Sequence, residues 1–427
     1  MTQNSFHRFW QTKVLRSMAA IGFLALVGCA ALPRCDAPPT LFNSATPVGF
    51  PSDVRFLSTD RESVEKQSAA ALQQIKKSSK DGIVRALILS GGGAGGAFGA
   101  GALVGLSRRQ ERPQYDVVTG VSTGALIAPF AFLGSEWDAQ LTEAFTSGQA
   151  EQMSLHGLHE LPFGASRRSA SLTALVDHYV TRDLLRAVAK EAGNGRLLWV
   201  ATTDLDKEET VIWDMGAIAM RGGEPARKLF RDVLVASASI PGVFEPVLIH
   251  VQQGGKLYDE MHIDGNASTS LFIAPVAAYF TLLDQRSLDG ARVYVLINGQ
   301  IIDAPETTPF KLRPIMARTF SAVLKHLSRA QVIAVSQFAV KYRMSVQSTY
   351  LPIDYPKYSS ADFRASTMRP LFEYGVRCAQ SGRLWTTLDE TMETVAAAAL
   401  ASERTPTADR EAECPLRGVQ FTAEDRR

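Results

Sequence analysis

The sequence has little net charge, few cysteines and few histidines, and each shortage excludes a class of protein. Its 427 residues carry a formal net charge of only +2, and no block of Lys and Arg alternates with aromatic residues. Nucleic acid is therefore not expected as a partner. The seven histidines are scattered and the four cysteines form no CxxC pair, so the sequence offers no ligand cluster for zinc. We predict no metal and no cofactor.

The apolar run near the N-terminus is too short to span a membrane. Met18–Val27 falls well below the roughly 20 residues that a spanning helix needs, and the residues before it are polar and basic, which is typical of an export signal. The residues that end this run, with Gly28 and Cys29, resemble the lipobox of bacterial lipoproteins. We predict a lipoprotein signal peptide over residues 1–28 and a lipid on Cys29; a plain signal peptide is the alternative. By the same resemblance, Ala30 after the cysteine indicates a lipid-anchored protein of the cell envelope, in the outer membrane and facing the periplasm.

The chain after Cys29 divides by composition. Residues 29–80 begin with a stretch rich in Pro, Ala, Ser and Thr, predicted as a tether, and continue with a polar surface helix over 61–80. Residues 81–280 alternate between strand and helix patterns, and residues 281–400 are predicted as the mainly helical C-terminal part of the same α/β unit. Residues 401–427 read as a polar tail.

The alternation predicts an α/β fold with a mostly parallel sheet covered on both faces. Strands are expected at Val84–Leu89, Tyr115–Thr119, Leu197–Thr203, Glu209–Trp213 and Val293–Ile297, and helices at Gly99–Arg109, Ala125–Phe132 and Pro225–Ala238. A further helix from Pro314 carries an apolar stripe that includes Met316 and Val323 and is expected to pack on the domain. Its basic residues are expected to be solvated; contact with an anionic lipid surface is the alternative.

The pentapeptide Gly120–Gly124 has the form GxSxG, with Ser122 at its centre. It directly follows a predicted strand and precedes a predicted helix, which is the context of a nucleophile elbow. Such a turn exposes the serine hydroxyl beside the helix N-terminus, whose dipole favours developing negative charge. Ser122 is therefore the candidate nucleophile.

A glycine-rich loop, Ser90–Gly99, follows the first predicted strand. Backbone N–H groups of successive glycines can point together at an anion, as an oxyanion hole or a phosphate cradle requires. The loop also fits GxGxxG, and Asp116 has the spacing of a dinucleotide-binding acid. Asp116 nevertheless begins its strand rather than ending it, so a nucleotide is the weaker interpretation.

A third motif places Asp264 before Gly265, at the end of a short strand. The GGGxxG loop, the GxSxG pentapeptide about 30 residues later and this Asp-Gly turn, in that order, resemble the patatin-like phospholipases. Two more stretches, 201–206 with 213–219 and then 236–246, also look like that family. The resemblance covers roughly residues 84–280 and implies a three-layer α/β sandwich with a helical C-terminal extension.

The resemblance also implies an activity, a serine acyl hydrolase that cleaves carboxylic esters of lipids. Ser122 would be the nucleophile and Asp264 the base, with Gly91, Gly92 and Gly93 forming the oxyanion hole. The partners expected are a lipid or ester substrate and a membrane reached through the N-terminal lipid, while the oligomeric state stays open.

The chain departs from the family pattern at two positions, Gly95 instead of Arg or Lys and Asn266 instead of Gly or Ala. The first departure leaves room for an alternative, an inactive envelope lipoprotein that serves as a scaffold or binding module. A Ser–Asp–His triad is a second alternative, but His326, the one histidine after Asp264, belongs to a helix and is predicted to be structural.

Two further side-chain predictions concern His262 and the cysteines. His262 shares a strand face with Asp264 and is expected to be an ordinary strand residue. Cys35, Cys378 and Cys414 remain if Cys29 is lipidated, and Cys378 with Cys414 is the preferred disulfide.

Overall fold

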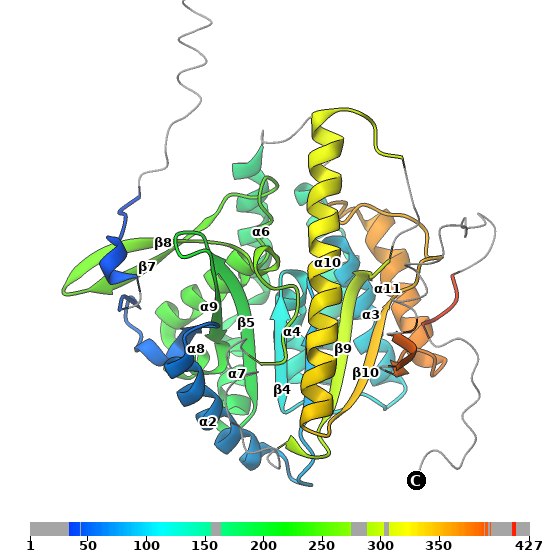
Figure 1. Cartoon of the computed structure of the whole chain (residues 1–427), viewed down its shortest axis with the longest axis horizontal. Coiled ribbons are helices and arrows are strands. Elements are labelled where there is room, and N and C mark those ends of the chain that lie inside the picture. Colours follow the sequence, from blue (N-terminus) through cyan, green and yellow to red (C-terminus); the bar gives the residue numbers. More distant parts are fainter. Residues whose placement is uncertain are drawn as a thin grey trace, which may run out of the picture.

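The computed structural model describes residues 34–42, 44–154, 164–274, 288–302, 307–387, 389–391, 393 and 412–415. Within these ranges one sheet of 11 strands runs through the molecule in the order β1-β7-β8-β5-β4-β3-β9-β10-β11, with β6 on β5 and β2 on β6 (Figure 1). Cys29 and the predicted signal peptide lie outside the described residues.

Five neighbouring strands in the middle of the sheet are parallel, as predicted. They are β5 (Leu197–Asp204), β4 (Val117–Val121), β3 (Arg85–Leu89), β9 (Arg292–Gln300) and β10 (Ser345–Leu351). Their apolar sequences fit strands that are buried on both faces. The flanking strands pair in antiparallel fashion: β8 (Lys256–Asp264), β7 (Val247–Gln253), β1 (Thr46–Pro47), β6 (Glu209–Asp214), β2 (Arg55–Leu57) and β11 (Thr386–Thr387).

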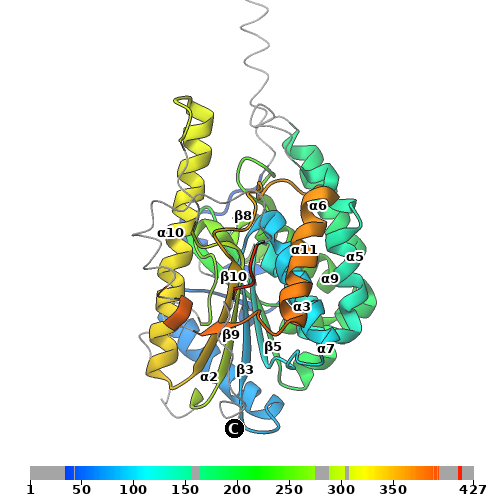
Figure 2. The same cartoon turned by 90° about the vertical axis from the view of Figure 1, so that its right-hand side faces the viewer.

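Helices cover the sheet on both faces and make three layers (Figure 2). One face carries α2 (Arg61–Ser78) and α10 (Leu312–Lys341). The opposite face carries α3 (Gly96–Arg108), α4 (Thr123–Leu133), α5 (Asp138–Thr146), α6 (Ala165–Tyr179), α7 (Arg182–Gly193), α8 (Met215–Arg221), α9 (Gly223–Ser237) and α11 (Ala365–Gln380). No helix within the described ranges has both the length and the apolarity needed to cross a bilayer.

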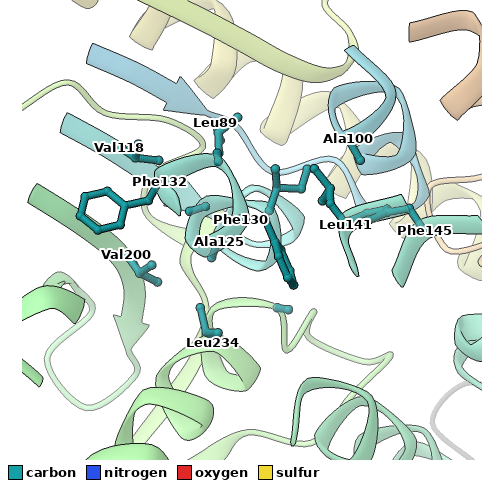
Figure 3. Packing of buried hydrophobic residues seen from close by; sticks show 14 of the residues in the cluster. Leu89, Ala100, Val118, Ala125, Phe130, Phe132, Leu141, Phe145, Val200 and Leu234 are labelled. Atoms are coloured by element: carbon teal, nitrogen blue, oxygen red, sulfur yellow. The ribbon is translucent and has the colours of Figure 1, made fainter. Parts of the chain in front are cut away.

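Successive side chains of the central strands pack in separate apolar clusters. Leu87 and Leu89 of β3 belong to the largest apolar cluster, whereas Ile88 between them packs in another cluster with Val332 of α10. Figure 3 shows the largest cluster, in which side chains of the strands meet those of α3, α4, α5 and α9. The period-2 alternation of strands accounts for this division, because successive side chains point to opposite faces.

The strands and helices predicted from the sequence are present, with ends shifted by up to three residues. The predicted tether is wrong for the described residues between 34 and 57. Two short strands in this segment pair with the sheet, β1 with β7 and β2 with β6, and the buried Arg55 forms an ion pair with Glu260. Strands of two or three residues are too short to show an alternating pattern, and the Pro-rich composition concealed them.

Two expectations for the C-terminal part also need correction. Residues 281–400 supply β9, as predicted, and also β10 between β9 and β11, a strand that was not predicted. The apolar stripe expected to pack α10 on the domain is not buried throughout, since Met316 and Val323 are exposed. The helix packs instead through residues of its second half, including Val332 and Val335.

The predicted disulfide between Cys378 and Cys414 is confirmed. It joins α11 to a described stretch at residues 412–415, while Cys35 is free and exposed. The two bonded cysteines are 36 residues apart, and closing a loop of that size reduces the entropy of the unfolded chain by an amount worth about 4 kcal/mol.

We predict that Cys378→Ser lowers the free energy of unfolding by about 2 to 4 kcal/mol, because the unfolded chain regains that entropy. Chemical denaturation followed by far-ultraviolet circular dichroism measures the change. Cys35→Ser is the matched control and should leave the midpoint unchanged. Equal midpoints for both variants would contradict the structural role of the bond.

Candidate active site

Strand β5 brings the ends of two other strands together. Along one side it pairs with β6 over residues 199–204. Along the other side, residues 197–201 pair with β4 and residues 202–204 pair with β8. The end of β8 therefore lies directly beyond the end of β4, because both use the same side of β5. Ser122 follows β4 and Asp264 ends β8, so this register brings them next to each other.

Ser122 occupies a strained turn between β4 and α4. Its φ is 55° and its ψ is −126°, in a region that non-glycine residues rarely adopt. The N–H of Ser122 donates to Ser237 Oγ at 3.0 Å, and Ser237 Oγ donates to the carbonyl of Ala201 at 2.7 Å. A side chain at position 124 would meet the carbonyls of Leu89 and Ser90, which explains the last glycine of the pentapeptide. These contacts hold the hydroxyl at the start of α4.

The hydroxyl of Ser122 donates to Asp264 Oδ2 at 2.6 Å. The other carboxylate oxygen accepts from the N–H of Asn266 at 2.8 Å. Ser122 and Asp264 are both buried, and burial raises the pKa of Asp264 to about 7, against the lowering effect of these two hydrogen bonds. A carboxylate with this pKa is a far better proton acceptor near neutral pH than an ordinary Asp.

The glycine-rich loop lies beside this pair at the same edge of the sheet. Leu89 of β3 pairs with Gly120 of β4, so both strands end together. Gly93 has a φ of +57°, and a side chain there would meet the carbonyl of Ser360. The N–H of Gly91 donates to the carbonyl of Ser270 at 3.1 Å and is already used, so of the three predicted oxyanion donors only Gly92 and Gly93 remain candidates.

Asn298, at the carboxyl end of β9, holds the base of this loop. Its N–H donates to Ser90 Oγ at 2.9 Å and its side-chain amide donates to the carbonyl of Ser90 at 2.6 Å. The Asn298 carbonyl lies 1.8 Å from where a Cβ on Gly92 would stand. Only glycine therefore fits at position 92. Backbone hydrogen bonds to Leu296, Ser270 and Ser360 hold the loop together with the side-chain contacts of Asn298.

The two departures from the family pattern have steric reasons. A Cβ at position 95 would lie 2.2 Å from the carbonyl of Asn298 and 2.5 Å from the hydroxyl of Tyr358. An Arg or Lys does not fit there, so the packing of Asn298 and Tyr358 accounts for Gly95. The side chain of Asn266 fills the space beside Gly91, and its buried Oδ1 has no hydrogen-bond partner within the described residues.

The other candidate residues lie away from the Ser122 hydroxyl or are engaged elsewhere. The Nδ1 of buried His262 lies 3.0 Å from Thr202 Oγ1, and its Nε2 lies 3.4 Å from Glu260, which agrees with a structural strand residue. His326 is exposed on α10. Asp116 accepts from the N–H of Arg85 at 2.8 Å, at the amino end of β4 and opposite the glycine loop. This position removes the dinucleotide interpretation.

Asp204, Glu260 and His262 form a buried cluster with the donor types of a metal site. The ammonium of Lys207 lies 2.9 Å from Asp204 and 3.0 Å from Glu260, and the guanidinium of Arg55 also pairs with Glu260. These two side-chain cations stand where a metal ion would have to bind. The cluster is therefore read as an internal ion-pair network that connects β2 and β8.

An apolar cavity lies beside the glycine loop and the start of α4. Its wall includes Gly93 of the loop and Thr123, the residue after Ser122, and its volume is about 70 Å³. The rest of the wall consists of Leu126, Pro129, Phe130, Ala144, Phe145, Ala150, Met153, Leu175, Val176, Tyr179, Val180, Leu184, Leu234, Phe363 and Met368. Among the described residues, no charged side chain lines it.

Sequence reasoning missed the side chains that support the site. Ser237 lies in the stretch 236–246, whose likeness to the family was noted without a role. Asn298 follows a correctly predicted strand, and a polar residue at the carboxyl end of a parallel strand is a usable signal. Tyr358 carried no signal, because it reaches the glycine loop from a segment that no motif marks.

Comparison with known proteins identifies the family of this domain. Residues 87–276 match the model described as patatin-like phospholipase, which supports lipid acyl hydrolase activity in general. No curated protein sequence matches the chain.

Three solved structures are similar to the chain at low sequence identity. VipD from Legionella pneumophila is 12% identical, with a TM-score of 0.32, 70% of this chain covered and 67% of that one. Human GIVD cytosolic phospholipase A2 is 11% identical, with a TM-score of 0.33 and coverages of 81% and 66%. The type III effector protein ExoU is 14% identical, with a TM-score of 0.24 and coverages of 75% and 61%.

The buried Asp264 predicts a pH-dependent cost to stability. Its pKa of about 7 in the folded protein exceeds the unfolded value of about 3.9. As pH rises from about 4 to 7, the unfolded state therefore loses this proton before the folded state does, and stability falls. Asp264→Asn keeps the shape and removes the charge. We expect the variant to exceed the unsubstituted protein in unfolding free energy by up to about 4 kcal/mol at pH 8.

Urea denaturation at pH 5 and pH 8 measures this difference, which should shrink towards the lower pH. Ser122→Ala is the control for loss of the hydroxyl contact alone. If Asp264→Asn is no more stable than the unsubstituted protein at pH 8, then folding does not raise the pKa of Asp264, and the prediction is contradicted.

Proposed function

We propose that this chain, through its patatin-like phospholipase domain, is a serine acyl hydrolase that cleaves carboxylic esters of lipids by a Ser–Asp dyad. The observation that carries the proposal is the 2.6 Å hydrogen bond from Ser122 Oγ to Asp264 Oδ2, made at a strained turn. In this proposal Cys29 bears the lipid that holds the enzyme at a cell-envelope membrane, where its substrate is found.

In the first step Ser122 Oγ attacks the ester carbonyl and its proton passes to Asp264. The pKa of Asp264, raised by burial to about 7, leaves a substantial ionised fraction at neutral pH and makes that fraction a competent base. The carbonyl oxygen becomes an oxyanion, and the N–H groups of Gly92 and Gly93 stabilise it. Removing one such donor typically costs about 10²–10³ in turnover.

In the second step the tetrahedral intermediate collapses and the leaving alcohol takes the proton from Asp264. The acyl group is then bonded to Ser122 Oγ. Water attacks this acyl-enzyme while Asp264 accepts its proton, and Asp264 returns that proton to Ser122 Oγ as the bond to the acyl group breaks and the free acid leaves. Each step needs one proton carrier, which fits the absence of a histidine among the hydrogen-bond partners of Ser122 and Asp264 in the described residues.

The apolar cavity supports a lipid acyl chain as the group transferred. It starts beside Gly93 and Thr123, where the acyl carbonyl would lie, and its remaining wall is apolar. Burying a methylene group contributes roughly 0.8 kcal/mol, so the cavity favours a long chain over a short one. Gly95 does not support the alternative of an inactive scaffold protein, since the packing of Tyr358 accounts for that residue.

Labelling with a fluorophosphonate probe tests the activity. We expect the folded protein to be labelled at a rate that rises with pH through about 7, because only ionised Asp264 accepts the Ser122 proton. Ser122→Ala should abolish labelling, and Asp264→Asn should slow it by about 10²–10⁴. Heat-unfolded protein is the control for non-specific reaction. Labelling that persists in Ser122→Ala would contradict the proposal.

The cavity predicts how activity depends on acyl length. Leu175→Trp places a larger ring in the wall and should lower kcat/KM for nitrophenyl palmitate at least about tenfold, with a small effect on nitrophenyl butyrate, because one or two lost methylene contacts already change binding by that factor. Leu257→Trp, on the exposed end of β8, is the matched control. An equal effect on both esters would show that the chain binds elsewhere.

A further inference from the structure

The segment after Asp264 contacts the glycine loop. Asp264 ends β8, and residues 268–274, which follow soon after it, belong to no helix or strand. The carbonyl of Ser270 in this segment accepts from the N–H of Gly91 at 3.1 Å. Gly92, the next residue of the loop, is a candidate oxyanion donor. The position of Ser270 therefore affects where that donor lies.

This segment is buried, so its backbone groups need hydrogen-bond partners within the protein. Thr269, Ser270 and Leu271 are 6%, 3% and 1% exposed. A buried N–H without an acceptor is costly, because it has lost its hydrogen bond to water. Within the described ranges no backbone carbonyl accepts from the N–H of Ser270 or of Leu271. A side chain has to be the acceptor for both groups.

The side chain of Gln331, on α10, binds this segment at both ends of its amide. Its Oε1 accepts from the N–H of Ser270 at 2.8 Å and from the N–H of Leu271 at 3.0 Å. Its Nε2 donates to Thr269 Oγ1 at 2.7 Å, and the Thr269 hydroxyl donates to the carbonyl of Leu271 at 3.2 Å. One side chain therefore holds three successive residues in a single arrangement.

The part of α10 that carries Gln331 is itself anchored to the domain. Val332, the next residue, lies in the same apolar cluster as Leu271. Arg329 donates to the carbonyl of Ile301 at 2.9 Å, just past the end of β9. Contacts with both the sheet and the segment thus fix the helix at this point, and Gln331 projects from a rigid support.

We propose that Gln331 is a positioning residue of the active site, which holds the oxyanion donors of the glycine loop in place through residues 269–271. This inference rests on the proposed function, because it concerns the oxyanion of the same reaction. Two hydrogen bonds in series, from Ser270 to Gln331 and from Gly91 to Ser270, join α10 to the loop. Gln331 acts through them on the N–H groups of Gly92 and Gly93.

The effect of losing Gln331 should fall on turnover rather than on substrate binding. The oxyanion develops only as the transition state forms, so misplaced donors weaken transition-state binding and leave the ground-state ester bound as before. A displacement of about 1 Å at a catalytic group can lower the rate about 100-fold. A purely structural role would lower the stability of the protein and leave kcat per folded molecule unchanged.

Hydrolysis of nitrophenyl butyrate by the full chain at pH 8, where most Asp264 is ionised, tests the proposal. Gln331→Met nearly keeps the shape of the side chain but removes the acceptor for the N–H groups of Ser270 and Leu271. Gln331→Glu keeps an acceptor oxygen and is the rescue variant. Gln337→Met makes the same change at an exposed position of the same helix and is the matched control. Complete labelling with a fluorophosphonate counts the active molecules, and circular dichroism checks folding.

We expect Gln331→Met to lower kcat per active molecule by about 10- to 100-fold, with KM changed by less than about threefold. Binding of a trifluoromethyl ketone, which forms a tetrahedral oxyanion with a serine nucleophile, should weaken by a similar factor to kcat. Gln331→Glu should restore most of kcat, and Gln337→Met should equal the parent.

Two results would overturn the inference and leave the proposed hydrolysis standing. One is a Gln331→Met variant that keeps the parent's kcat, or that loses no more affinity for the ketone than for the ester. The other is a kcat in Gln331→Glu as low as in Gln331→Met. A folded parent that releases no nitrophenol and takes no fluorophosphonate label would instead overturn the proposed hydrolysis, and this inference with it.

Discussion

The pairing of β5 with two strands along one side is the constraint on which the site depends. Ala201 pairs with the last residue of β4 and Thr202 pairs with Asp264 at the end of β8. One strand running parallel to β5 and one running antiparallel therefore meet end to end, and their terminal side chains face each other. A shift of β8 by one residue would turn Asp264 to the opposite face of the sheet. The ion pairs of Glu260 with Arg55 and Lys207 help hold that register.

The same arrangement makes the site costly to fold. Two features of the site oppose folding. Ser122 has a φ of 55°, and such a backbone conformation costs about 1–3 kcal/mol in a non-glycine residue. Asp264 is buried where ionisation is unfavourable. Their surroundings offset these costs through the hydrogen bond from the Ser122 N–H to Ser237 and the contacts of Asn298 with the loop. In the proposed hydrolase, the same strain and burial would give the hydroxyl its position and the carboxylate its basicity, so that stability is exchanged for reactivity.

The candidate site residues could be located from the sequence because each lies in a local motif. Ser122 and the glycine loop follow strands with clear apolar patterns. Asp264 was assigned to the same site only because the three motifs, taken in order, resemble a known family. The supports were harder to predict, since Ser237 and Tyr358 act through contacts between distant segments. The packing of α10 was mispredicted because its exposed Met316 and Val323 have the spacing of a buried stripe. The period of the apolar residues shows that a helix is amphipathic, but it does not show what covers the apolar side.

The most direct test of this account is a crystal structure of the protein after reaction with a phosphonate that mimics the tetrahedral intermediate. The account predicts phosphorus bonded to Ser122 Oγ and the phosphonyl oxygen about 2.7–3.1 Å from the N–H groups of Gly92 and Gly93, with Asp264 still beside the serine and the alkyl chain in the apolar cavity. A phosphonyl oxygen turned away from the glycine loop, or an adduct on another residue, would contradict it.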